Sequence, residues 1–376
     1  MARLPQGVVK RKDGLLQKRF TLNGKRYSIY AHTLDELTQK EQDKRLEIAS
    51  GTYKANKLIT LDNYFKEFLE HKSKSIKGNT LYAYKCLYYK HVSPTLGKCK
   101  IKDIEKRQCI DLQNKLLEKN SEGMTNRALL VLSIVLNAAI SDDIISKSPT
   151  HGLKSVKKNK QKATQTIHKA LSEQEQADLL QQLREDNAFY YECICFMLAT
   201  GVRVGECTTL TWSDIDYKAN VIHITKTLSR TIDGHKVVTS PKTECSIRDI
   251  PMNDTIKRIL KEQRKKYLLL WQANGDKMQD RIFTNPYGDI PTSQPVSKEI
   301  TKAIKHLNDN GNPIQRITCH GLRDTFATRY IEQGGSPQTL KTILGHSSLA
   351  MTMDLYSQVL PNTKQEEMNR LQIIGL

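Results

Sequence analysis

One segment of this chain cannot contribute to a hydrophobic core, and it separates two regions that can. Residues 154–172, KSVKKNKQKATQTIHKALS, are basic and polar and nearly free of large apolar side chains before Ile167. A charged, polar stretch between two patterned regions is typical of an interdomain linker. The sequence therefore predicts a multidomain protein, and its length suits two or three domains of about 100–200 residues each.

The region before the linker contains two units with different patterns. Residues 1–57 carry 13 Lys and Arg against 6 Asp and Glu, and their Asp-Gly and Asn-Gly dipeptides are strong hairpin signals. We expect short strands followed by a helix over LDELTQKEQDKRLEIAS, a common shape of small nucleic-acid-binding domains. Residues 58–153 contain several helical patterns, and GMTNRALLVLSIVLNAAISDDII is apolar enough for the buried centre of a bundle.

The region after the linker mixes helices with strands. Ser172 and Glu175 form a capping-box pattern ahead of a helix, and NVIHITKT, GHKVVTS and SIRDIPM have the pattern of strands. We place the linker at 154–171 and the last domain at 172–376. The predicted fold class is multidomain and mainly α with small β-sheets: a sheet plus helix, then a helical domain, then an α+β domain.

The charge of the chain indicates a polyanionic partner. It has 59 Lys and Arg against 40 Asp and Glu, a formal net charge of +19. An excess of this size favours nucleic acid over a merely solvated surface, although residues 1–57 could also be a basic arm that only adds affinity. The basic residues that we expect to contact double-stranded DNA are Lys10, Arg11, Lys12, Lys18, Arg19, Lys25 and Arg26, with Lys157 and Lys158 in the linker.

Several other classes of protein are disfavoured. No apolar run reaches the roughly 18 residues needed to span a membrane, and the N-terminus lacks the apolar segment of a secretory signal. The eight cysteines form no C-x-x-C pair and no zinc spacing with His, so we predict no metal site and no disulfide framework. The P-loop pattern is absent as well. We expect a soluble, cytoplasmic, DNA-associated protein without a cofactor or a membrane partner.

The most specific pattern lies near the C-terminal end, in HGLRDTFATRYIEQGGSPQTLKTILGHSSLAMTMDLYSQV. His320 and Arg323 are spaced i,i+3, and Thr318 before them is a plausible N-cap, so both would lie near a helix N-terminus, where anions bind well. His346 follows a predicted glycine cap of the next helix, and Tyr356 follows ten residues later.

These residue types fit chemistry on a phosphodiester. A phenol has a pKa of about 10 and needs activation to act as a nucleophile at neutral pH. The charge of the phosphodiester in the transition state must be spread over metal ions or guanidinium groups. The sequence has no carboxylate-rich metal cluster, but it has Arg323 and also Arg203, which lies in TGVRVGE between two glycines.

At these motifs the last domain resembles the catalytic domain of tyrosine recombinases, the family of phage and conjugative-element integrases. The matching pieces are TGVRVGE, SPKTECSIRDIP, HGLRDTFATRY, LGHSS and MDLYSQV, in family order. The layout is also similar to that family's arm-binding domain (1–57), core-binding domain (58–153) and catalytic domain (172–376). The resemblance implies a site-specific recombinase that cuts and rejoins DNA through a covalent 3′-phosphotyrosine, without ATP, to integrate and excise a mobile element.

The resemblance also implies a role for each residue. Tyr356 matches the nucleophile, Arg203 and Arg323 match the two guanidiniums that neutralise the phosphate, and Lys242 matches the lysine that protonates the departing 5′-oxygen. Two further positions, His320 and His346, match those that orient the phosphate and assist proton transfer. Lys226 and Lys236 lie in the same hairpin region, but Lys242 occupies the turn that the family uses. Asp324 stands where many members carry a His, so an acid could tether Arg323.

Partners and alternatives follow from the same likeness. The family implies a homo-tetramer on DNA that assembles through the C-terminal tail, although packing of the tail on its own domain is the simpler alternative. Accessory proteins that bend DNA or direct excision are also implied. A DNA-binding regulator on a degenerate scaffold would lack one of Arg203, Lys242, Arg323 or Tyr356, and all are present. A type IB topoisomerase shares the chemistry, but the separate basic first block and the short tail favour a recombinase.

Overall fold

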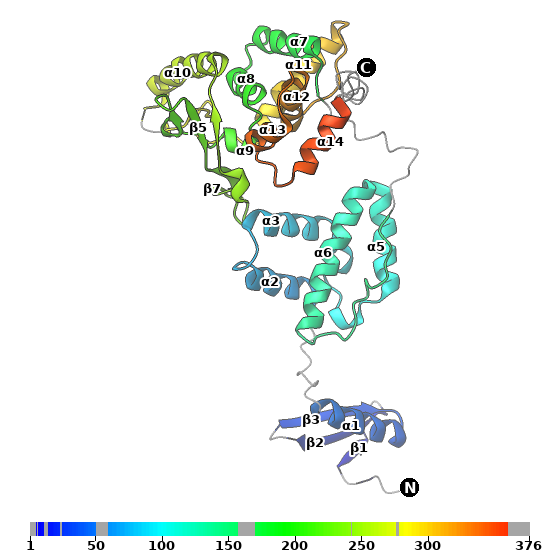
Figure 1. Cartoon of the computed structure of the whole chain (residues 1–376). Coiled ribbons are helices and arrows are strands. Elements are labelled where there is room, and N and C mark those ends of the chain that lie inside the picture. The colour runs from blue at the N-terminus through cyan, green and yellow to red at the C-terminus, as the bar shows by residue number, and fades with distance from the viewer. Residues whose placement is uncertain are drawn as a thin grey trace, which may run out of the picture. The chain divides into compact units, whose positions relative to one another are not determined.

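The structure is a computed structural model, which describes residues 5, 7–10, 14–22, 25–49, 59–156, 170–241, 243–275 and 278–359 (Figure 1). The chain divides into two compact units, residues 1–158 and 159–376. The division falls within the predicted linker, most of which lies outside the described residues.

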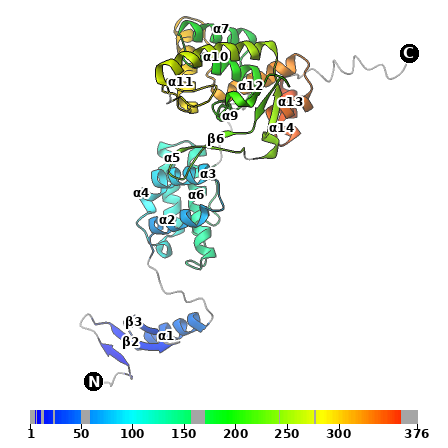
Figure 2. The same ribbon diagram turned by 90° about the vertical axis from the view of Figure 1, so that its left-hand side faces the viewer.

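A small antiparallel sheet and one helix form the first part of the chain. The strands lie in the order β1-β2-β3, and α1 covers one face of the sheet (Figures 1 and 2). Leu22 of β2 pairs with Lys25 of β3, so only two residues join these strands, as the Asn-Gly dipeptide predicts. The elements are β1 (Val8–Lys10), β2 (Leu16–Leu22), β3 (Lys25–Ala31) and α1 (Leu34–Ala49). The core between them consists of Leu16, Phe20, Ile29, Ala31 and Leu37.

Helices make up the rest of the first unit, as predicted. Their bounds are α2 (Leu61–Lys72), α3 (Gly78–Leu87), α4 (Ser93–Leu96), α5 (Lys106–Lys119) and α6 (Glu122–Ser141), with a π-helical turn at Tyr88–Val92. This turn buries Tyr88 against Phe65 of α2, with ring centroids 3.7 Å apart. The Tyr88 hydroxyl donates to Asp62 at 2.8 Å, which satisfies the one polar atom that the ring carries inside.

Of the helices in the described residues, α6 alone is long and apolar enough to cross a membrane. This corrects the expectation that no apolar stretch reaches that length. Ser, Thr and Asn interrupt the apolar pattern of α6, but they add no charge, so the helix is still apolar enough as a whole. One side of α6 is buried in the bundle, which is how the core helix of a globular domain meets the same criterion. The buried residues are Thr125, Ala128, Leu129, Val131, Leu132, Val135, Leu136 and Ala139.

The second unit combines helices with two small sheets. A three-stranded antiparallel sheet has the order β4-β5-β8, and β6 and β7 form a separate hairpin. The predicted capping box is present, because Ser172 accepts from the backbone of Glu175 and Glu175 bonds the Ser172 backbone in return. The helices are α7 (Glu173–Glu185), α8 (Tyr191–Thr200), α9 (Val204–Cys207), α10 (Asp254–Asn274), α11 (Ser293–Asp309), α12 (Cys319–Glu332), α13 (Pro337–Leu344) and α14 (Leu349–Val359). The strands are β4 (Ile215–Asp216), β5 (Val221–Ile224), β6 (Thr227–Arg230), β7 (Lys236–Thr239) and β8 (Arg248–Pro251).

The last three helices lie side by side (Figures 1 and 2). α13 begins at Pro337 after the cap residue Ser336 and ends at Gly345, in agreement with the sequence signals. α14 packs on α12 and α13 through Leu355, which joins a small apolar cluster. The other members of that cluster are Ala327, Ile331, Leu340 and Leu344, with Phe326 and Tyr330 packed against it.

Candidate active site

Two of the predicted arginines meet at the C-terminal end of α13. Arg323, on α12, donates to the Leu344 carbonyl at 2.6 Å and to the Gly201 carbonyl at 2.9 Å. Arg203, just before α9, donates to the Gly345 carbonyl at 3.4 Å. The last carbonyls of a helix have no partner within the helix and carry partial negative charge, so they attract cations. The end of α13 thereby holds both guanidiniums in one place.

A third arginine, which the sequence analysis did not assign, completes this cluster. Arg248 of β8 is buried, and its Nε donates to the carbonyl of Ile343, the next residue back along α13. Its Nη2 lies 3.0 Å from Glu206 Oε2, and the other oxygen of Glu206 accepts from Arg203 at 2.8 Å. Burial would raise the pKa of Glu206, but Arg248 and Arg203 outweigh it and hold that pKa below its ordinary value. Glu206 is therefore an ionised bridge between a structural arginine and a predicted phosphate ligand.

The two predicted phosphate ligands differ in exposure. Arg203 keeps about 39% of its side chain exposed, whereas Arg323 is buried. Burial, and then the neighbouring Arg203, lower the pKa of Arg323 to about 9, which still leaves the guanidinium protonated at pH 7. An anion bound between the two would relieve their mutual repulsion. The pair is thus arranged to bind a phosphate.

Gly345 joins this cluster to the turn that follows Lys242. Its φ of 65° lies in the left-handed region, and a Cβ at this position would come within 2.8 Å of the Cys245 carbonyl oxygen. The helix end therefore packs directly on residues 245–246. Lys242 itself lies outside the described residues.

We predict that Gly345→Ala destabilises the protein by about 1–3 kcal/mol, since both the left-handed φ and the close approach to Cys245 oppose a side chain. Gly334→Ala is the matched control, because Gly334 has a φ of +78° but open space around its Cβ position. Urea denaturation of both variants separates the strain of the backbone from the contact. Equal losses in the two variants would contradict the role given to the contact.

The other two lysines of the hairpin region are bound to protein groups. Lys226 forms an ion pair with Asp214 at 2.9 Å, and Lys236 donates to the Ile290 carbonyl at 2.6 Å. Both contacts hold the ammonium groups in structural roles. Lys242 stays the lysine that the motif predicts for proton transfer.

His346 lies next to the guanidinium cluster. Burial lowers its pKa to about 4, and the charges of Arg323, Arg203, Arg248 and His320 add to the effect. Its imidazole is therefore neutral at pH 7. The ring Nδ1 lies 3.0 Å from the hydroxyl of Thr352 on α14.

His320 and Arg323 occupy the first turn of α12, as predicted from Thr318 as N-cap. They point differently, because the His320 side chain is 73% exposed while Arg323 is buried. Asp324 Oδ1 lies 3.9 Å from His320 Nε2. The guanidinium donors of Arg323 go to backbone carbonyls, while the Asp324 carboxylate lies near His320 and also favours the charged form of Arg323.

Tyr356 lies in α14, the helix that packs on α12 and α13. Its backbone is described, whereas its side chain lies outside the described part of the structure. The neighbouring Leu355 and Thr352 are buried. The helix that carries the predicted nucleophile is thus docked beside α12, which carries Arg323, and α13, which ends just before His346.

The predicted DNA contacts of the first part are distributed over both faces of its sheet. Lys10 and Arg19 are exposed. Lys18 points toward α1, where it forms an ion pair with Glu41 and has a structural role. Six predicted contacts lie outside the described residues or have side chains that do: Arg11, Lys12, Lys25, Arg26, Lys157 and Lys158.

Two residues of the site were missed by sequence reasoning. Arg248 and Ile250 both lie on the buried face of β8. The signal available in the sequence was therefore an arginine at an inward-facing position of a strand. Thr352 had no comparable signal, since a threonine one turn before Tyr356 is unremarkable in a helix. Both are recognisable only from their contacts.

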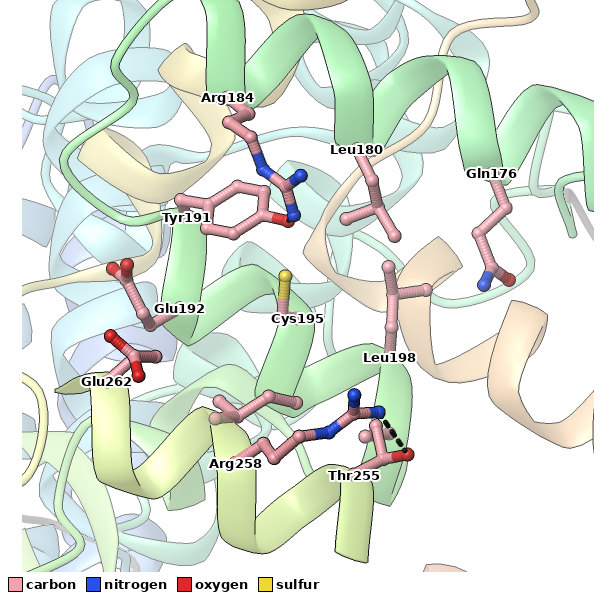
Figure 3. A pocket seen from close by; sticks show the side chains of 12 residues that line it. Gln176, Leu180, Arg184, Tyr191, Glu192, Cys195, Leu198, Thr255, Arg258 and Glu262 are labelled. Atoms are coloured by element: carbon pink, nitrogen blue, oxygen red, sulfur yellow. Dashed lines mark hydrogen bonds between the residues drawn. The ribbon is translucent and has the colours of Figure 1, made fainter.

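A separate pocket of about 590 Å³ lies between α7, α8 and α10 (Figure 3). Apolar side chains such as Leu180 and Leu198 face charged ones, and Arg184 donates to the Tyr191 hydroxyl at 2.8 Å. None of the predicted site residues lines it. Within the described residues, no group of three or more His, Cys, Asp or Glu is placed to hold a metal ion.

A cluster of guanidiniums beside two histidines and a tyrosine-bearing helix suits a class of enzyme that carries out phosphoryl transfer and in which arginines stabilise the charge on the phosphate oxygens. Comparison with known families agrees with this class. Residues 169–363 match the phage integrase family, and residues 60–117 match the phage integrase N-terminal SAM-like domain. Because the first match covers more than half of the chain, the protein belongs to the phage integrase family.

Individual relatives agree. The chain is 24% identical to ICEBs1 integrase of Bacillus subtilis (strain 168), over 91% of this chain and 90% of that protein. A solved structure of the Tn1549 transposon integrase with transposon right end DNA has a TM-score of 0.66 and 23% identity, and the match covers 83% and 99% of the two chains. A lambda integrase tetramer bound to a Holliday junction has a TM-score of 0.56 and 18% identity, over 96% and 97%.

These findings confirm the predicted fold class and the predicted enzyme class. The chain has the mainly helical integrase fold with small sheets. It is a tyrosine recombinase, an enzyme of site-specific recombination that cleaves and rejoins DNA.

Proposed function

We propose that Tyr356 is the nucleophile and that Arg203 and Arg323 bind the scissile phosphate. The phenol oxygen attacks phosphorus, the bond from phosphorus to the 5′-oxygen breaks, and a 3′-phosphotyrosine forms. One phosphodiester replaces another, so the reverse attack by a 5′-hydroxyl reseals the strand without ATP. The observation that carries this proposal is the pair of guanidiniums held at the end of α13 beside the docked α14.

The proton transfers are proposed for three side chains. Lys242 gives a proton to the departing 5′-oxygen, which would otherwise leave as an alkoxide. His320 accepts the phenol proton, a role supported by the exposure of its side chain; the Asp324 carboxylate lies 3.9 Å from its Nε2. His346 is neutral and donates a hydrogen bond to a phosphate oxygen, which orients the phosphate without adding another charge.

The remaining domains are proposed to place this site on DNA. Residues 58–153 contact the core site, the linker over 154–171 follows the backbone through Lys157 and Lys158, and residues 1–57 contact a second, arm-type site. Within residues 1–57, Arg19 on the exposed face of the sheet is the best-supported contact, because Lys18 is paired with Glu41.

Assembly and biological role are proposed from the same relatives. A homo-tetramer on two duplexes is supported by the fold shared with a lambda integrase tetramer on a Holliday junction. Assembly through the C-terminal tail is proposed from the family resemblance alone. The named relatives support a role on a mobile element, and we propose both integration and excision, with accessory proteins that bend DNA or direct excision. The enzyme would then act on cytoplasmic DNA.

We predict that the wild-type protein forms an SDS-stable adduct with a nicked suicide duplex that carries its attachment site. A nick lets the cleaved fragment diffuse away, so the covalent intermediate accumulates. The same yield is expected in EDTA, because arginines supply the charge stabilisation. Gel electrophoresis of the labelled duplex measures the adduct. Absence of the adduct would reject the proposal, and loss of the adduct on chelation would assign the chemistry to a metal ion.

A further inference from the structure

We infer that Thr352 is a positioning residue, which sets the tautomer of His346 and makes that setting depend on the docking of the helix that carries Tyr356. The inference rests on the proposed roles of His346 and Tyr356. It adds a link between them that neither residue provides alone.

The geometry of Thr352 carries this inference. Its side chain is fully buried, and its hydroxyl lies 3.0 Å from His346 Nδ1. His346 follows the end of α13, whereas Thr352 lies in α14, so the bond crosses between two elements. Tyr356 follows Thr352 by four positions along α14, so the two residues lie on the same side of the helix, one turn apart. The helix cannot move away from α13 without breaking this bond.

The chemistry of a neutral imidazole makes the bond matter. A neutral ring carries one N–H, and the other nitrogen can only accept. If the Thr352 hydroxyl donates to Nδ1, the proton must be on Nε2, which can then donate to a phosphate oxygen. If Nδ1 carries the proton, Nε2 becomes an acceptor and faces the phosphate with a lone pair. A hydroxyl can donate or accept, so the contact is compatible with either tautomer; in the inferred arrangement Thr352 donates, which leaves the proton on Nε2 and lets His346 attract its ligand.

The surrounding charges explain why the ring depends on such a partner. The groups that face it are Arg323 from α12, Arg203 from the start of α9, Arg248 from β8 and His320 from α12. The three guanidiniums have no acceptor, so none of them can hold a proton on a chosen ring nitrogen. Within the described residues, the Thr352 hydroxyl is the hydrogen-bond partner found for the ring.

A functional consequence follows. When α14 is docked, Tyr356 is near the site and His346 carries its proton on Nε2. When α14 leaves, the nucleophile and the preferred tautomer are lost together. The protein therefore orients the phosphate fully only while its nucleophile is in place, which limits hydrolysis of the phosphate by water.

Thr352→Val and Thr352→Ser test the inference. Valine keeps the shape and removes the hydroxyl, whereas serine keeps the hydroxyl. We expect Thr352→Val to slow single-turnover cleavage of a saturating suicide duplex about tenfold, the size of one lost hydrogen bond in the transition state, and Thr352→Ser to restore most of the rate. Thr200→Val is the matched control, since Thr200 is also fully buried but bonds only the Phe196 carbonyl within α8.

Nitrogen-15 NMR of labelled histidine gives a readout that a merely structural role would not change. The His346 signals, assigned with His346→Gln, should report the Nε2–H tautomer in wild type, Thr352→Ser and Thr200→Val, and a mixture in Thr352→Val. Wild-type tautomer and rate in Thr352→Val would overturn the inference. The inference would also be overturned if the cleavage rate fell only as far as the melting temperature fell, and if it fell equally in Thr352→Ser. The NMR comparison needs no cleavage, so it still decides the inference if no adduct forms and the proposed nucleophile is wrong.

Discussion

Replacing Tyr356 by Phe abolishes the covalent protein–DNA adduct, with an expected loss of at least about 10³-fold in single-turnover cleavage. Phenylalanine keeps the ring but removes the oxygen that bonds to phosphorus, so no covalent intermediate can form. DNA affinity should stay within about twofold, because binding depends on the basic surface rather than on the phenol. The measurement is denaturing gel electrophoresis of the adduct, with binding measured separately by fluorescence anisotropy.

Tyr287→Phe is the control for this experiment. Tyr287 is 74% exposed and lies outside the site, so loss of its hydroxyl should leave the adduct unchanged. An undiminished adduct from Tyr356→Phe would remove Tyr356 from its proposed role. Peptide mapping of the wild-type adduct would then identify the residue that is linked to DNA.

Replacing Arg323 by Lys should reduce single-turnover cleavage by about 10²–10³-fold, although the charge is retained. A lysine has one ammonium and cannot hold the Gly201 and Leu344 carbonyls while it also faces a phosphate. At least one carbonyl then loses its donor, and we expect a stability cost of about 1–3 kcal/mol. Cleavage at saturating DNA measures the first effect and urea denaturation the second.

Arg281→Lys is the matched control. Arg281 is also partly buried and donates to a backbone carbonyl, that of Thr209, but it lies outside the guanidinium cluster. We expect a loss of stability without a comparable loss of cleavage. If the two variants lost cleavage equally, the effect of Arg323→Lys would be structural and its assignment as a phosphate ligand would fail.

Local signals in the sequence predicted much of the fold because they are local in the structure too. The serine and proline at the start of α13 and the glycine at its end are satisfied by groups a few residues away. The two-residue turn between β2 and β3 and the capping box of α7 also depend only on residues close in the sequence. The exception is α6, whose apolar length is that of a membrane helix and whose burial in a bundle depends on distant partners.

The chemical types at the site were also readable from the sequence. Motif order identified Arg203, Lys242, His320, Arg323, His346 and Tyr356 as one set, and residue chemistry limits what such a set can do. The roles of Lys242 and of the Tyr356 side chain remain predictions from those motifs. Exposure was not readable, since Arg323 is buried and His320 is exposed although they share one turn.

The amino-acid sequence by itself determined the elements and the family and predicted the reacting groups, because capping, turn chemistry and motif order act over short distances along the chain. Only the tertiary structure decided how these groups depend on one another. The convergence of Arg203, Arg248 and Arg323 on three successive carbonyls at the end of α13 joins residues 21 to 142 positions apart. The bond from Thr352 to His346 joins α14 to the segment that follows α13. Such contacts depend on packing in three dimensions, so a pattern read along the chain does not contain them.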